Sequence, residues 1–123
     1  PVNATIQAAQ TYVLNVRAAE EFLVQQDAAT SGARYAALLA KLKEARDLLR
    51  WNPASGRPAH FLAAKSGQAR VMASRALALA AAHGVPELRE LVVRPYVLLY
   101  AHGANRVVLL ALKHERQLVF KMR

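Results

Sequence analysis

The chain has 123 residues, a length that fits one domain with one hydrophobic core. Hydrophobic residues make up 54% of it, which excludes a disordered chain, and the absence of cysteine excludes a disulfide framework and thiolate metal sites. Its 17 Lys and Arg against 8 Asp and Glu give a formal net charge of +9, which points to a polyanionic partner.

The first predicted elements are a strand and a helix. The segment Thr11–Arg17 is rich in β-branched and aromatic residues, a composition typical of strands. The pattern becomes helical over Ala18–Gln26, and Asp27–Gly32 then interrupts it with residues that favour helix caps. We expect Thr30 or Ser31 to start the next helix.

The clearest helix is predicted over Ala33–Trp51. One apolar stripe runs along it at intervals of four, three and four residues: Leu38, Leu42, Ala45 and Leu49. The turn residues of Asn52–Gly56 end the helix. Two helices joined by a short polar link form an antiparallel hairpin, and Trp51 is expected to pack under it.

A further helix is predicted over Ser66–His83, which is dominated by Ala and Leu and contains no proline. Its expected apolar face includes Val71 and Leu79 and is interrupted by Arg75. Gly84–Pro86 ends it.

Three strands follow as a meander. They are predicted over Leu88–Val93, Tyr96–Tyr100 and Arg106–Lys113, with a turn at Arg94-Pro95 and a hairpin loop at His102–Asn105. The expected fold class is therefore α+β, a helical hairpin packed on a small antiparallel sheet, with an extra inserted helix.

The basic residues concentrate in the second half of the chain. Residues 1–60 carry seven basic and five acidic side chains, whereas residues 61–123 carry ten basic and three acidic ones. Nucleic acid and an acidic protein segment both fit this asymmetry, and a solvated basic surface is the alternative. The histidines His60, His83 and His102 lack metal-ligand spacing, so we predict no metal. The sequence shows neither an apolar run of about 20 residues nor a signal peptide, and we expect a cytoplasmic protein without membrane contact.

The order of these segments resembles the RelE/ParE toxin superfamily of type II toxin–antitoxin systems, and the ParE or plasmid-stabilisation branch within it. The matching segments are Asn52–Pro58 (Asn-Pro-x-x-Gly-Arg-Pro), Leu88–Val93, Tyr96–Tyr100 and His114–Gln117. The match extends from about Thr11 to Leu118. Some thirty residues separate Gly-Arg-Pro from the Leu-Arg strand, where the family has a short connection. We expect them to be a helical insertion at about 61–86 within a single domain spanning 1–123.

The resemblance to the ParE branch implies a toxin that inhibits growth by binding and poisoning DNA gyrase and that a cognate antitoxin neutralises, without a cofactor. The target-binding residues that this implies are cations of the sheet and tail: Arg89, Arg94, Arg106, Lys113, His114, Arg116, Lys121 and Arg123.

The RelE branch implies an alternative function, ribosome-dependent cleavage of mRNA by 2′-hydroxyl attack. Arg89 and Arg116 would clamp the phosphate, His114 would move a proton, and Lys113 would converge with them. No tyrosine follows Tyr100, although several ribonuclease members use one in the tail, and this absence argues against a complete ribonuclease site. We therefore assign no catalytic residue.

Two alternatives without a toxin function are also compatible with the sequence. His114 at a strand end is commonly a surface histidine, and Arg89 can pair with Glu87 or with an acid across the strand. On charge alone, the chain can also be a non-toxic basic domain that binds nucleic acid.

Overall fold

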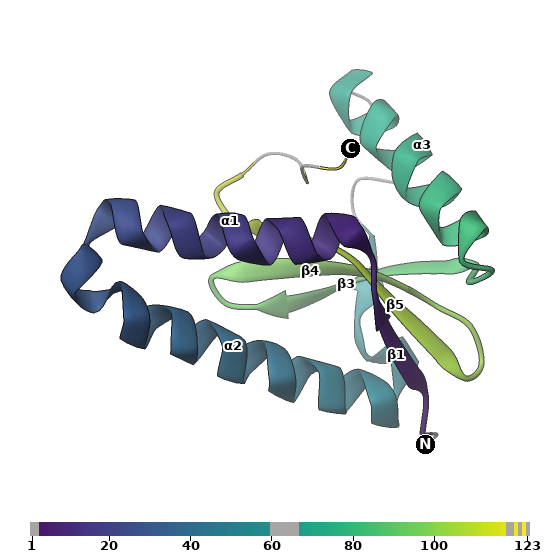
Figure 1. The fold of residues 1–123 in the computed structure, drawn as a ribbon. Helices are drawn as coiled ribbons and strands as arrows, with labels where there is room; N and C mark the ends of the chain where they lie inside the picture. The colour runs from purple at the N-terminus through teal and green to yellow at the C-terminus, as the bar shows by residue number, and fades with distance from the viewer. Residues whose placement is uncertain (1–2, 60–66, 118–119, 121, 123) are drawn as a thin grey trace.

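The computed structural model describes residues 3–59, 67–117, 120 and 122. A five-stranded sheet carries a helical hairpin on one face and a third helix on the other (Figure 1). In chain order the elements are β1 (Thr5–Ala8), α1 (Gln10–Gln26), α2 (Ala28–Trp51), the short 3-10 helix η1 (Pro53–Ser55), β2 (Arg57–Pro58), α3 (Gly67–Ala82), β3 (Glu87–Val93), β4 (Tyr96–His102) and β5 (Arg106–His114). The α+β class is confirmed.

The sheet is mixed, which corrects the antiparallel sheet expected from the sequence. Its strand order is β1-β5-β4-β3-β2, and β1 pairs with β5 in parallel, with Thr5 opposite Arg106. The other neighbours are antiparallel. Tight turns force antiparallel pairing between β3, β4 and β5, whereas β1 reaches β5 from a distant part of the chain, so no turn sets its direction.

The strand predicted over Thr11–Arg17 is wrong, because this segment belongs to α1 and the strand lies earlier, at Thr5–Ala8. The buried residues of α1 recur at helical spacing: Tyr12, Ala19 and Leu23. Their packing against the sheet and α2 outweighs the local strand propensity of the β-branched residues between them. The true strand is mostly exposed, and with four residues its apolar alternation, Ile6 and Ala8, is too short to predict a strand.

The predicted stripe of α2 is confirmed, since Leu38, Leu42, Ala45 and Leu49 are all buried. The helix begins earlier than expected because Asp27 caps it, with its carboxylate accepting a hydrogen bond from the backbone N–H of Ala29 at 3.1 Å. The expectation for Trp51 is wrong, since this side chain is 62% exposed on the last turn.

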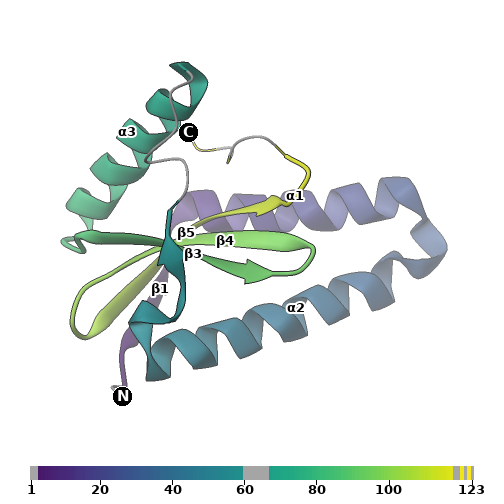
Figure 2. The same cartoon turned by 180° about the vertical axis from the view of Figure 1, so that it is seen from behind.

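The predicted third helix is confirmed as α3, but its orientation differs from the prediction. It turns Met72, Ala76 and Ala80 toward the sheet, while Val71 is exposed. Alanine is the commonest residue of this helix, so hydrophobicity varies little around it and periodicity does not orient it. Figures 1 and 2 show that α3 lies at the opposite end of the molecule from the turn joining α1 and α2.

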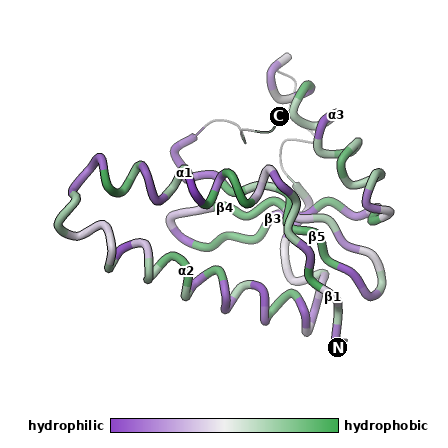
Figure 3. The backbone as a smooth tube through the Cα atoms, viewed as in Figure 1, coloured by the Kyte–Doolittle hydropathy of each residue, from purple (hydrophilic) through white to green (hydrophobic). Residues whose placement is uncertain are grey.

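The sheet separates two apolar layers. On the hairpin side, Leu98 and Tyr100 pack with the buried stripe of α2, and on the α3 side Val97 and Leu99 pack with α3. Every residue of β4 is buried, which explains why the central strands are predominantly hydrophobic in Figure 3. Among the described residues, no helix combines the length and apolar character needed to cross a bilayer.

Candidate functional site

The structure does not bring the predicted ribonuclease residues together. Arg89 pairs with Tyr100 and His114 pairs with Tyr96, so both lie on the hairpin face, but on different strands and four residues apart along β4. At about 3.3 Å per residue, this offset corresponds to roughly 13 Å along the strand. The expected convergence of Arg89 with Lys113, His114 and Arg116 is therefore wrong.

Lys113 lies on the other face of the sheet from His114, because it pairs with Val97, which packs in the α3 layer. Its ammonium group donates a hydrogen bond of 3.0 Å to the carbonyl oxygen of Gln117 and lies 5.5 Å from the ring centroid of Phe120. These contacts engage the ammonium with the C-terminal segment.

Arg89 is tied into a polar network at the η1 end of the sheet. Its Nε donates to Nε2 of His102 at 3.1 Å, and its Nη1 donates to the carbonyl oxygen of Gly56 at 3.0 Å. The other ring nitrogen of His102, Nδ1, lies 3.1 Å from the carbonyl oxygen of Gly103. A carbonyl only accepts, so Nδ1 carries the proton and Nε2 is left as the acceptor for Arg89. Neither Glu87 nor a cross-strand acid pairs with Arg89 among the described residues.

Arg106 lies at the start of β5, far from His114 at its end. Its guanidinium donates to the carbonyl oxygen of His83 and to the side-chain oxygen of Gln7. Arg94 lies in the β3–β4 turn, where it contacts Glu115 at 3.4 Å. The remaining predicted residues, Lys121 and Arg123, lie outside the described residues.

Among the described residues, three of the predicted cations gather at one end of the sheet: the exposed Arg94 and Arg116, and the half-buried His114. This basic end also receives Arg34 and Lys41 from α2, which line a pocket of about 210 Å³ together with Arg94. The ammonium of Lys41 donates to the carbonyl oxygen of Arg94 at 3.0 Å, so α2 and the β3–β4 turn are joined there.

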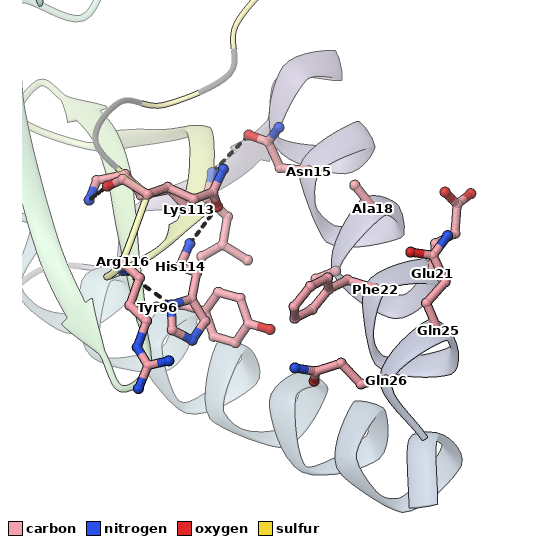
Figure 4. Close-up of a pocket in the computed structure, with 13 residues that line it drawn as sticks. Asn15, Ala18, Glu21, Phe22, Gln25, Gln26, Tyr96, Lys113, His114 and Arg116 are labelled. Atoms are coloured by element: carbon pink, nitrogen blue, oxygen red, sulfur yellow. Dashed lines mark hydrogen bonds between the residues drawn. The ribbon is translucent and has the colours of Figure 1, made fainter. Parts of the chain in front are cut away.

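A larger pocket of about 540 Å³ lies between α1 and the end of β5, and we call it the α1–β5 pocket (Figure 4). Its sheet side is lined by Tyr96, His114 and Arg116, and its helix side by Phe22 and Gln26. A volume of this size accommodates a small molecule or a few side chains of a partner.

The ring of His114 is held in place from two sides. Its Nδ1 accepts a hydrogen bond of 3.1 Å from the backbone N–H of Arg116, and its ring meets that of Tyr96 edge-on at a centroid distance of 5.5 Å. The form of imidazole that accepts at Nδ1 carries its proton on Nε2. The nitrogen that is free to engage a ligand is therefore a hydrogen-bond donor.

Sequence reasoning missed the contribution of α1 to this pocket. The segment was predicted as a strand up to Arg17, which hid the fact that Asn15, Ala18 and Phe22 lie on one helix face. The side chain of Asn15 also accepts a hydrogen bond of 2.9 Å from the backbone N–H of Leu112, which fixes α1 against β5. A helical reading of residues 10–26 would have placed these side chains together.

The titration of Tyr96 follows its surroundings. Burial raises the pKa of its hydroxyl above the ordinary value of 10.0, while the charge of Arg34 lowers it. The hydroxyl is therefore a donor at neutral pH. Across the described part of the chain, no three His, Asp or Glu side chains are grouped so that they could hold a metal ion.

Comparison with solved structures finds the same arrangement in a chain of "Chromosomal ParDE TA system from P. aeruginosa", with a TM-score of 0.58 and 12% sequence identity. The alignment covers 91% of this chain and 96% of that chain. This chain has a ParE-like fold. The resemblance drawn from the segment order is thus confirmed for the fold. No protein-family model matches the sequence, and no curated protein matches it. At 12% identity the ParE-like fold assigns no functional residue. Candidate functional residues therefore come from the geometry of this chain.

Proposed function

We propose that this chain is the toxin of a toxin–antitoxin pair of the ParDE kind. The observation that carries the proposal is the ParE-like fold, which extends over 91% of this chain and 96% of a chain of the ParDE system. In this proposal residues 1–123 form one toxin domain in the bacterial cytoplasm, and the segment at about 61–86 is a helical insertion in it. The part of that insertion that the structure describes is α3 and the turn after it.

The proposed target is DNA gyrase, which the toxin would bind and poison. The basic end supports a contact surface because Arg94 is 79% exposed and Arg116 is exposed beside the α1–β5 pocket. Arginine is enriched in the central contacts of protein interfaces, and exposed cations attract a complex that holds DNA. Lys121 and Arg123 would extend this surface, whereas the hydrogen bonds of Arg89 give that residue a structural role.

The proposed second partner is a cognate antitoxin. The net charge of +9 favours an acidic protein segment, because opposite charge accelerates association and disfavours wrong partners. A segment that folds on binding could cover the exposed apolar residues of the hairpin.

A ribosome-dependent endoribonuclease is the second candidate function. It is favoured by the proximity of His114 and Arg116, which places a proton donor and a guanidinium beside one pocket. The separation of Arg89 and the different face of Lys113 weigh against it. We therefore favour gyrase over the ribosome as the proposed target.

Induction of the protein in a bacterial host tests these functions together. A gyrase poison arrests growth with an SOS response, and the purified protein makes gyrase accumulate cleaved plasmid DNA. Early loss of translation with cut messages supports the endoribonuclease instead. Normal growth, with purified protein that only binds nucleic acid, supports the basic binding domain and contradicts both toxin functions.

A matched pair of variants locates the contact surface. The double substitution Arg94→Glu and Arg116→Glu reverses the charge of the basic end at exposed positions, so the fold should persist. Arg70→Glu makes a similar change on the exposed side of α3, at the other end of the molecule. Toxicity should fall with the first variant and persist with the second. Equal toxicity of the double variant and the wild type would contradict the proposed surface.

A further inference from the structure

Tyr96 of β4 is a buried tyrosine whose hydroxyl stays accessible to solvent. The residue is 8% exposed and packs in the hairpin-side core. Among the described residues, no hydrogen bond reaches this hydroxyl, and the ring of Tyr96 meets that of His114 edge-on. Tyr100, four residues further along β4, has the hydrogen bonds usual for a buried tyrosine, since its hydroxyl has two backbone partners. Because no buried side-chain oxygen or nitrogen of the described residues lacks a hydrogen-bond partner, the Tyr96 hydroxyl is open to solvent rather than enclosed in the core.

The Tyr96 hydroxyl points into the α1–β5 pocket. Figure 4 shows it directed across the pocket toward Phe22 on α1. Its pKa is raised by burial, so it stays protonated at neutral pH and can donate a hydrogen bond. The pocket therefore contains a donor that only a ligand or water can satisfy.

Two further residues with hydrogen-bond donors line the same pocket, His114 and Arg116. The proton of His114 lies on Nε2, because its Nδ1 accepts from the backbone N–H of Arg116 at 3.1 Å. Arg116 also lines the pocket, and its guanidinium has no carboxylate partner within the described residues. A neutral hydroxyl, an imidazole N–H and a guanidinium form a donor set for an oxyanion.

The helix side of the pocket offers a different chemistry. Phe22 is 50% exposed and presents an aromatic ring opposite the donors, with the amide of Gln26 beside it. An aromatic ring at this position can stack on a planar group, and amides can bind its polar edge. The acid that lines the pocket, Glu21, points away from the ring of Tyr96 in Figure 4 and does not occupy the donor set.

We propose that the α1–β5 pocket binds a small planar ring compound that carries one oxyanion. The oxyanion would accept hydrogen bonds from Tyr96, His114 and Arg116, while the ring would lie against Phe22. Two classes of compound share this chemistry, a nucleoside monophosphate and an aromatic carboxylic acid. The volume of about 540 Å³ lies within the range for small-molecule sites. The site does not depend on the toxin function, so a protein that leaves growth unaffected would still bind the compound.

Calorimetric titration of the full chain tests the site with two charged probes, adenosine 5′-monophosphate and indole-3-carboxylate. Their uncharged counterparts, adenosine and indole, serve as controls. We expect at least one charged probe to bind in the micromolar to millimolar range, about 10-fold or more above its uncharged counterpart, since hydrogen bonds to charged groups are the strong ones. Binding of only one charged probe identifies the ligand class. Failure of both, or equal affinity for a charged probe and its uncharged counterpart, overturns the proposal.

Three variants assign the binding to the pocket. Tyr96→Phe removes a hydroxyl that has no partner among the described residues, so the melting temperature should not change while affinity falls about 10-fold. Arg116→Gln, at an exposed position, should also weaken binding about 10-fold. This variant tests the site independently, should Tyr96→Phe fail to fold. Arg94→Gln is the matched control, because Arg94 lies at the same end of the sheet but lines the other pocket. Unchanged affinity in Arg116→Gln, or an equal loss in Arg94→Gln, contradicts the assignment.

Discussion

The hydroxyl of Tyr100 accepts a hydrogen bond of 2.9 Å from the backbone N–H of Gly56 and donates one of 2.7 Å to the carbonyl oxygen of Pro53. The donated bond joins positions 47 residues apart and links β4 to the segment that follows α2. A single buried side chain thus satisfies two backbone groups of the connection between the helical hairpin and the sheet. These two bonds fasten the Asn-Pro-x-x-Gly-Arg-Pro segment to the sheet.

Tyr100→Phe should destabilise the protein by about 1–3 kcal/mol, because it leaves a backbone donor at Gly56 and an acceptor at Pro53 without their partner. Urea denaturation measures the loss. Tyr96→Phe is the matched control, since it removes the same atom from a hydroxyl with no partner among the described residues. A similar loss in both variants would show that the hydrogen bonds of Tyr100 contribute little.

Gly56→Ala should destabilise the protein by about 1–3 kcal/mol through steric overlap. A Cβ atom at this position would lie 2.5 Å from the carbonyl oxygen of Glu90 and 2.7 Å from the hydroxyl of Tyr100. Gly32→Ala should have the opposite effect, because Gly32 lies within α2 and a Cβ there meets nothing within 4 Å. The gain expected from helix propensity is about 0.5–1 kcal/mol. The order of the two melting temperatures checks both statements.

Arg89→Ala should reduce stability by about 1–3 kcal/mol, since it removes the donors to His102 and Gly56. Arg116→Ala should change stability by less than about 0.5 kcal/mol, because its side chain is exposed and has no ion pair in the described part of the chain. Chemical denaturation of the two variants distinguishes the structural arginine from the accessible one. The reverse order would place Arg89 among the binding residues again.

Stability should fall as the pH rises above about 10, partly because of Tyr12. Burial raises the pKa of its hydroxyl above the ordinary value of 10.0 and outweighs the charge of Arg46, which lowers it. Between the unfolded and the folded pKa, the folded chain holds a proton that the unfolded chain has released. The stabilisation is therefore complete below the unfolded pKa and is lost as the pH rises through the folded one.

Urea melts of the wild type and Tyr12→Phe at pH values below and above 10 measure this effect. The loss of stability between the two pH values should be smaller in the variant, because the phenol is absent and every other group still titrates. An equal loss in both proteins would show that Tyr12 has the same pKa in the folded and the unfolded chain.

The sequence predicted well those elements whose pattern is set locally. The stripe of Leu38, Leu42, Ala45 and Leu49 fixed both the type and the buried face of α2, because one helix period separates these residues. The strands β3, β4 and β5 were likewise predictable, since turn residues at Arg94-Pro95 and Gly103 separate continuous apolar runs. These signals were sufficient for the α+β class and for the resemblance to the RelE/ParE superfamily.

The local sequence pattern failed for segments whose conformation or buried face is set by packing against other parts of the chain. Thr11–Arg17 has strand-like residues but packs as a helix, and β1 is a mostly exposed edge strand of only four residues. The orientation of α3 was not predictable, because its own alanines occur on several faces of the helix. In each case the packing partner, which lies far away in the chain, decides the outcome.

The candidate site shows the same division. Three properties follow from the amino-acid sequence alone: the excess of cations in the second half of the chain, the lack of cysteine chemistry, and the combination of a helical hairpin with a meander of strands. Which cations meet depends on the tertiary structure. Strand register pairs Arg89 and His114 with β4 residues that are four positions apart, Tyr100 and Tyr96. Side-chain alternation turns Lys113 to the other face of the sheet. The packing of α1 on β5 then formed a pocket around Tyr96, because a pocket depends on contacts between segments that no local pattern encodes.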